Sequence, residues 1–109
     1  MANITSIEEF EDLVSEAVVK PLVIEYTAEW CPSCKALKPF VNAIEAKSLN
    51  DKAFDLRIID IDEIPELVEL EDIDLIPSLK VYYKGEAVEY EGPMKPSRLA
   101  AFITELTGK

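Results

Sequence analysis

The sequence predicts an α/β fold, with a mixed central sheet of four to five strands and helices on both faces. Two segments, 22–28 and 54–61, have the character of buried strands, and a helical pattern separates them. Two strands joined in this way form a parallel, right-handed unit. Residues 79–90 are typical of an antiparallel hairpin, which makes the sheet mixed. The chain has 109 residues, 49% of them hydrophobic, which predicts a single domain spanning residues 1–109.

The first helix is predicted from a capping pattern near the N-terminus. Ser6 is followed three residues later by Glu9, a spacing typical of a capping box at a helix start. The apolar residues after it have helical spacing, and we expect the helix to end near Lys20 and Pro21. Residues 3–5 are expected to form a weak edge strand before this helix. The residues with helical spacing are Phe10, Leu13, Val14, Ala17 and Val18.

A second helix is predicted over residues 34–46, after the first buried strand. Pro39 lies inside this pattern and should kink the helix, because proline has no backbone N–H and its ring crowds the preceding turn. Residues 65–70 predict a short helix with proline in its first turn. The apolar side of the longer helix is formed by Leu37, Phe40, Val41 and Ile44.

The C-terminal part predicts a hairpin and a helix. Side chains alternate over residues 79–83, Lys84 and Gly85 form the turn, and residues 87–90 return antiparallel. The predicted order is therefore β-α-β-α-β-α-β-β-α. The final amphipathic helix is defined by Leu99, Phe102, Ile103 and Leu106.

Both cysteines of the chain lie two residues apart at a predicted helix start. This placement predicts a small, reversible disulfide and therefore thiol–disulfide exchange. Cys31 lies just before the helix, where unpaired N–H groups, the helix dipole and Lys35 favour its thiolate. Cys34 lies one turn further on and should be more shielded, so Cys31 is the expected attacking thiol and Cys34 the resolving one. The segment is Trp30-Cys31-Pro32-Ser33-Cys34-Lys35.

A metal or iron–sulfur site is the alternative interpretation of the cysteine pair. Such sites usually need four ligands, and this chain has no histidine and no third cysteine. A dimer could combine two pairs, so a non-catalytic binding module bridged by a metal or cluster remains an alternative. Asp60, Asp62 and Glu63 also suggest a cation site, but a solvated strand end explains them better.

Two further residues near the cysteines have alternative interpretations. Glu25 lies within the apolar run 22–26, and a buried carboxylate is usually neutral, paired or functional. It could accept the proton of Cys34 through water, or it could point outward from a sheet edge. Trp30 could belong to the core, but its place before a redox cysteine predicts a substrate surface.

Charge and composition exclude several classes of partner. The formal net charge is −11, so nucleic acids and anionic membranes should be repelled. No apolar stretch approaches the ~18 residues that a membrane span needs. Residues 1–16 have no apolar segment typical of a secretory signal. Two cysteines are too few for a disulfide-stapled secreted domain, so we expect a cytoplasmic protein.

The segment around the cysteines resembles the thioredoxin family. Residues 23–35 look like that family's strand, active site and helix start, and Pro39 falls where the family kinks its active-site helix. Residues 76–79 are similar to the segment with the family's cis-proline. Residues 84–86 match its hairpin turn, and Gly92 matches its late glycine. The resemblance spans nearly the whole chain, with the motifs in the family's order.

The resemblance implies a thioredoxin fold and a protein disulfide reductase. It implies that a separate flavin- and NADPH-dependent reductase recharges Cys31 and Cys34, with no cofactor bound to this chain. Substrates would be disulfide-containing proteins, and we expect a monomer. A cis-proline at Pro77 would leave the Ile76 backbone free to pair with an extended substrate. Trp30 and Gly92 are expected to complete this substrate surface.

Three positions depart from the thioredoxin pattern. Pro32-Ser33 stands where typical thioredoxins have Gly-Pro, and Glu25 stands where they have aspartate, as in protein disulfide isomerase domains. Those domains have a histidine at the position of Ser33 and often an arginine at that of Met94. A glutaredoxin-like member and an oxidising or isomerase-type member therefore remain alternatives.

Overall fold

The computed structural model describes residues 3–108 and shows a four-stranded mixed sheet in the order β2-β1-β3-β4. Strand β1 (Leu22–Thr27) pairs in parallel with β2 (Asp55–Asp60) and antiparallel with β3 (Ser78–Tyr83). Strand β4 (Glu86–Tyr90) closes a hairpin with β3. The predicted α/β class with a mixed sheet is confirmed.

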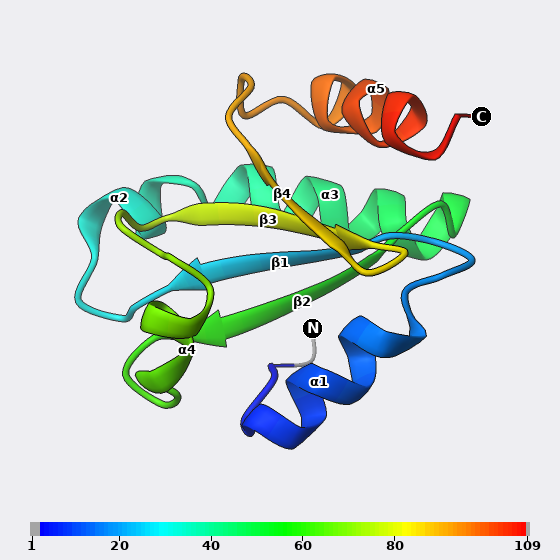
Figure 1. Ribbon diagram of the computed structural model, residues 1–109. Helices are drawn as coiled ribbons and strands as arrows, with labels where there is room; N and C mark the ends of the chain where they lie inside the picture. Colours follow the sequence, from blue (N-terminus) through cyan, green and yellow to red (C-terminus); the bar gives the residue numbers. More distant parts are fainter. Residues whose placement is uncertain (1–2, 109) are drawn as a thin grey trace.

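Helices cover both faces of the sheet, as Figure 1 shows. Helices α1 (Ile7–Glu16) and α4 (Glu66–Leu70) lie on one face, and α3 (Lys38–Asp51) and α5 (Pro96–Thr107) lie on the other. The short helix α2 (Pro32–Ala36) follows the C-terminal end of β1 and leads into α3. The segment that contains the two cysteines therefore lies at the C-terminal end of the inner strand β1.

Strand β1 is the centre of the fold and is buried on both faces. Leu22, Ile24 and Tyr26 pack in the core beneath α1 and α4, whereas Val23 packs against α3 and α5. Because successive side chains alternate along a strand, Glu25 lies on the same face as Val23. A strand with neighbours on all sides has no solvated face, which explains its continuous apolar pattern.

Helix α1 ends earlier than predicted, at Glu16 instead of near Lys20. Ala17 leaves the helical conformation, and its carbonyl accepts a hydrogen bond from the Lys84 N–H at 2.8 Å. The turn of the β3–β4 hairpin thus contacts the chain where the helix stops. The predicted capping box at the other end is present, since the Ser6 hydroxyl accepts from the Glu9 N–H at 3.1 Å.

The expected edge strand at residues 3–5 is reduced to a single bridge. Asn3 pairs in parallel with Ile58, and the Ile4 N–H donates to the Ile58 carbonyl at 2.8 Å. Ile4 is fully buried in the core beneath α1. Burial of one side chain, more than strand pairing, holds this segment against β2.

The helix predicted at 34–46 is two helices, α2 and α3, which meet at Leu37. Pro39 cannot donate the helical hydrogen bond, so the regular pattern is interrupted where a kink was expected. The Leu37 N–H still donates to the carbonyls of Ser33 and Cys34, both at 3.2 Å. The break separates a short helix at the cysteines from the long helix that packs on the sheet.

The remaining elements follow their predictions closely. Helix α4 begins at Glu66 with Pro65 as its N-cap, so the proline lies just before the first turn and not within it as predicted. Lys84 and Gly85 form the hairpin turn with positive φ values of 51° and 79°. Helix α5 buries Leu99 and Ile103 against α3 and the sheet, as its amphipathic pattern predicts.

Candidate active site

Cys31 and Cys34 form a disulfide at the start of α2, with their Cα atoms 5.3 Å apart. Cys31 is the N-cap of this helix, and Pro32 occupies its first turn. The Cys34 N–H points back and donates to the Cys31 sulfur at 3.1 Å. A hydrogen bond to sulfur from a helix N–H stabilises negative charge there, so the geometry favours a thiolate at Cys31 after reduction.

The two cysteines are buried to nearly the same degree. Cys31 is 4% exposed and Cys34 is 5% exposed, so the prediction that Cys34 is more shielded is not met in the disulfide form. Both pack with Ala28, and Ile61 and Ile76 cover them. Exposure therefore does not distinguish the two cysteines. They differ in that the Cys31 sulfur accepts a helix N–H and in the groups that lie near Cys34.

Glu25 is buried in the inner strand β1, at 4% exposure. Its partners across the sheet are Ile58 in β2 and Leu79 in β3. The alternative that it points outward from a sheet edge is therefore wrong. Burial raises the pKa of Glu25 from 4.5 to about 7, and the charge of Lys38 partly opposes this rise. The carboxyl group can hold or release a proton near neutral pH.

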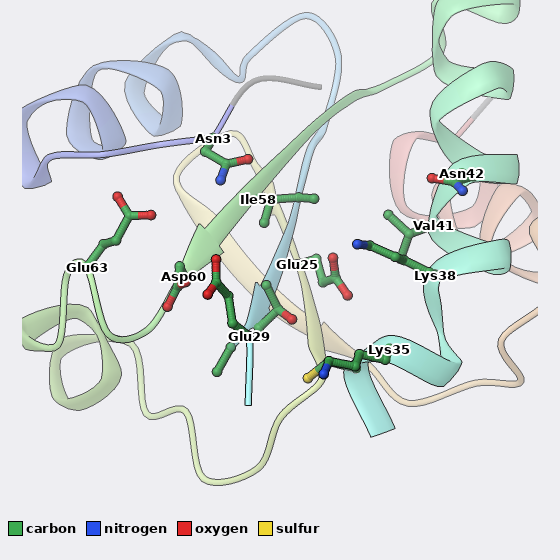
Figure 2. A pocket seen from close by; sticks show the side chains of 13 residues that line it. Asn3, Glu25, Glu29, Lys35, Lys38, Val41, Asn42, Ile58, Asp60 and Glu63 are labelled. Atoms are coloured by element: carbon green, nitrogen blue, oxygen red, sulfur yellow. The ribbon is translucent and has the colours of Figure 1, made fainter. Parts of the chain in front are cut away.

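A pocket of about 550 Å³ is lined by both Glu25 and Cys34. Cys34 and Lys35 line it from α2, and Lys38 and Asn42 line it from α3. Figure 2 shows the Glu25 carboxyl group facing the cavity and Lys38 pointing toward it. Cys34, and not Cys31, lines the same cavity as Glu25. This places a group that titrates near neutrality close to the second cysteine. The remaining lining residues are Asn3, Thr27, Ala28, Glu29, Val41, Ile58, Asp60 and Glu63.

Trp30 lies on the surface beside the disulfide and is 63% exposed. Its indole N–H donates to Asp62 at 2.9 Å, and the Asp62 N–H donates to the Asp60 carboxylate at 2.9 Å. The acidic residues at the end of β2 therefore orient the tryptophan. Within residues 3–108, no group of three or more acidic, cysteine or histidine side chains is arranged to hold a metal ion.

The segment before β3 also borders the disulfide. The Ile76–Pro77 peptide bond is cis, and both residues are half-buried. Ile76 packs against the cysteines, and its N–H and C=O make no backbone hydrogen bond within residues 3–108. Leu75 next to it is 81% exposed. An unpaired stretch of backbone and apolar side chains thus lie together beside the disulfide.

Gly92 lies where no larger residue fits without movement. A Cβ at this position would be 2.8 Å from the Tyr90 hydroxyl oxygen and 2.9 Å from its ring. The Tyr90 hydroxyl donates to the Pro93 carbonyl, which tightens the same turn. The shape of the chain between β4 and α5 therefore depends on this glycine.

Three residues of the site were missed by the sequence prediction. Lys38 is one of two lysines in the helical pattern 34–46, and only the fold brings it to Glu25. Asp62 was noted for its charge, but its bond to Trp30 joins residues far apart in the chain. The exposure of Leu75 could have been predicted in part. It is a large apolar residue in a loop near Pro77, outside any helical or strand pattern that would bury it.

The Thioredoxin family model matches residues 2–105 of the chain. The chain belongs to the thioredoxin family. Rabbit (Oryctolagus cuniculus) thioredoxin is 30% identical over 105 residues, which cover 95% of this chain and 96% of that protein. Rat (Rattus norvegicus) protein disulfide-isomerase A4 is 29% identical over 102 residues, which cover 93% of this chain and 16% of that protein. The chain thus spans only a small part of the isomerase's length.

Solved structures agree with this assignment. Plasmodium falciparum thioredoxin superposes with a TM-score of 0.77 at 30% identity, covering 96% of this chain and 98% of that one. The predicted thioredoxin fold is confirmed. The chain is a thioredoxin-family thiol–disulfide oxidoreductase with a redox-active cysteine pair. None of the helices in the described part is long and apolar enough to span a membrane.

Proposed function

We propose that this oxidoreductase works as a protein disulfide reductase, with Cys31 as the attacking thiol and Cys34 as the resolving thiol. The observation that carries the proposal is the shared pocket of Cys34 and Glu25 beside a Cys31 sulfur that accepts a helix N–H. In this arrangement Cys31 is suited to be a stabilised thiolate, and Cys34 is a thiol with a proton acceptor nearby. Thiol–disulfide exchange requires both functions.

In the first step, the Cys31 thiolate attacks one sulfur of a substrate disulfide. A bond forms between Cys31 and that sulfur, the substrate S–S bond breaks, and the other substrate sulfur leaves as a thiolate. The Cys34 N–H and the positive charge of Lys35 on the same helix stabilise the attacking thiolate.

In the second step, Cys34 resolves the mixed disulfide. Its proton passes to the Glu25 carboxylate, through water in the pocket, and its sulfur attacks Cys31. The Cys31–Cys34 bond forms, and the second substrate thiolate is released, so two electrons have passed from the cysteine pair to the substrate. A carboxyl group with a pKa of about 7 is suited to accept this proton at neutral pH.

The substrate surface comprises Trp30, Ile76, Pro77 and Gly92, and Leu75 extends it. The exposed indole ring and the Leu75 side chain offer apolar contact on either side of the disulfide. The unpaired Ile76 backbone can pair with an extended segment of the substrate, as in strand addition. We include Gly92, in the turn between β4 and α5, because it matches the late glycine of the family.

The electron donor proposed for the oxidised form is a flavin- and NADPH-dependent thioredoxin reductase, a separate protein. We place the reaction in the cytoplasm, with the chain acting as a monomer that binds no cofactor of its own. A chain with only two cysteines, both in the active site, supports a reducing compartment.

The test is reduction of insulin disulfides with each of two electron donors in parallel. NADPH with thioredoxin reductase should sustain turnover, and glutathione at cytosolic concentration should sustain much less. Cys31→Ser should abolish turnover with either donor. Turnover with glutathione alone would favour the glutaredoxin-like alternative, and net oxidation of reduced substrates would favour the oxidising one.

A further inference from the structure

The groups around Glu25 differ sharply in charge from one element to the next. The two strands beside it contribute Ile58 and Leu79, which carry no charge. The pocket in front of it is bordered by the negative residues Glu29, Asp60 and Glu63, and by positive residues from the helices. Among the described residues that line the pocket, cations from α2 and α3 are therefore the only charged groups that favour an ionised Glu25. They are Lys35 and Lys38.

Lys38 differs from Lys35 in its position, at the start of α3. It is the first residue of α3, directly after the break at Leu37 and before Pro39. Figure 2 shows its ammonium group directed across the pocket at the Glu25 carboxyl group. Among the described residues the two groups form no direct ion pair, and Lys38 is itself exposed to solvent. Its charge acts on Glu25 across the cavity.

We propose that Lys38 is a positioning residue for the reaction, which keeps Glu25 sufficiently ionised at neutral pH to take the proton from Cys34. The proposal rests on the proposed role of Glu25. Burial alone favours the neutral carboxyl group, and a neutral carboxyl group cannot accept a proton. The opposing charge of Lys38 recovers part of the ionised form, in agreement with its direction of effect on the pKa of Glu25.

The break between α2 and α3 places Lys38 where it can have this effect. Lys38 begins a new helix whose N-terminal end borders the pocket, and Val41 and Asn42, one turn further along the same face, line it too. Pro39 secures the break because it cannot donate to the preceding turn. The kink therefore has a chemical consequence besides its structural one.

The direct test is the titration of Glu25 by carbon NMR of its side-chain carboxyl group in the oxidised protein. Lys38→Gln should raise the pKa of Glu25 by about half a unit, a modest shift because solvent screens an exposed lysine. Lys38→Arg should leave the pKa close to the wild-type value. Lys20→Gln is the charge-matched control. Lys20 lies before the start of β1, at the end far from the cysteines, and pairs with Asp55. Its replacement should not change the pKa of Glu25.

The kinetic test follows release of the mixed disulfide by Cys34 as a function of pH. In Lys38→Gln the acidic limb of the profile should move up with the pKa of Glu25, so that release slows about twofold at pH 7 and is unchanged at high pH. An equal loss at every pH would show a structural role and overturn the proposal. In a Glu25→Gln background, Lys38→Gln should have no further effect on the profile.

The two proposals fail in different ways. If Glu25→Gln leaves the acidic limb unchanged, then Glu25 is not the acceptor and the proposed second step is wrong. If Glu25→Gln removes that limb while Lys38→Gln moves neither the limb nor the pKa of Glu25, only the role of Lys38 is wrong.

Discussion

At the scale of single residues, the two cysteines differ by their partners and not by their exposure. Cys31 accepts the helix N–H, and Cys34 shares a cavity with a protonatable carboxyl group. The positions of the cysteines in the sequence predict the same roles, with Cys31 attacking and Cys34 resolving. Part of the reason was different, because Cys34 was expected to be more shielded than Cys31. In the disulfide form the two are buried alike.

The first prediction concerns the mixed disulfide. Cys34→Ser removes the resolving thiol, so the protein should accumulate covalent complexes with substrates through Cys31. In the reduced wild-type protein, iodoacetamide near neutral pH should label Cys31 first, because its thiolate is the more stable one. Mass spectrometry of both products provides the measurement. Cys31→Ser is the control and should trap nothing; faster labelling of Cys34 would reverse the two roles.

The second prediction concerns the stability cost of Glu25. The folded-state pKa of about 7 lies above the ordinary value of 4.5, so between these values the folded protein keeps a proton that the unfolded chain has lost. The favourable contribution is complete below pH 4.5 and is lost as pH rises through 7. Glu25→Gln should therefore match the wild type near pH 4 and be more stable at pH 8, by up to about 3 kcal/mol.

Urea unfolding at several pH values measures this difference. Glu29→Gln, in the exposed rim of the same pocket, is the matched control for loss of one carboxylate without loss of a buried one. A constant difference between wild type and Glu25→Gln across the whole range would mean that Glu25 does not titrate near neutrality in the folded protein.

At the scale of elements, a buried hydrogen-bond chain ties α4 to the sheet. The Tyr82 hydroxyl donates to the Glu71 carboxylate at 2.8 Å, and the Tyr26 and Tyr82 hydroxyls lie 2.6 Å apart. Lys80 donates to the Glu71 carbonyl and lies 3.7 Å from its carboxylate. From Glu71 the polypeptide continues directly into the segment that ends at Ile76 beside the disulfide. The end of α4, and the loop after it, therefore depend on partners in β1 and β3.

The third prediction tests this chain. Tyr82→Phe removes both hydrogen bonds and leaves the buried Tyr26 hydroxyl without its partner, whereas the Glu71 carboxylate keeps Lys80 nearby. The loss should cost about 1–3 kcal/mol of stability. Tyr26→Phe removes only one bond and should cost less. Tyr83→Phe, on the neighbouring half-buried position, should be close to neutral. Equal effects of the three variants in urea unfolding would show that the hydroxyl groups contribute nothing beyond ring packing.

At the scale of the whole molecule, the reduction potential compares the complete reduced and oxidised proteins. Stabilising the Cys31 thiolate favours the reduced form and makes the disulfide more oxidising, by about 30 mV per 1.4 kcal/mol. The helix start, Lys35 and the Cys34 N–H act in this direction, whereas no histidine is present to strengthen the effect. From this balance we expect a potential between that of an ordinary thioredoxin and those of the strong oxidants.

The fourth prediction is therefore a potential somewhat above about −270 mV and well below about −120 mV. Equilibration with a glutathione redox buffer, followed by the fluorescence of Trp30, measures it. Trp30 is the single tryptophan and lies beside the disulfide, so its signal should report the redox state. A value at or below that of ordinary thioredoxins would contradict the argument that stabilisation of the Cys31 thiolate raises the potential. A value near the upper bound would contradict the reductase proposal.

The order of elements and the redox segment follow from local patterns in the sequence. Apolar runs, helical spacing and the Lys84-Gly85 turn are properties of neighbouring residues, so they predict strands, helices and the hairpin without tertiary information. The spacing of Cys31 and Cys34 likewise limits the pair to a small disulfide or a shared metal site. Element ends were less accurate, as the early end of α1 and the single bridge at residues 3–5 show.

By itself, the sequence determined the fold class, the cysteine pair and the expectation that Glu25 is buried. The tertiary structure alone decided which groups surround that carboxyl group. The sheet register puts Ile58 and Leu79 beside it, and the break before α3 directs Lys38 at it. The physical reason is range: backbone patterning acts over a few residues, whereas the pKa of a buried group depends on every charge and apolar surface that folding brings close.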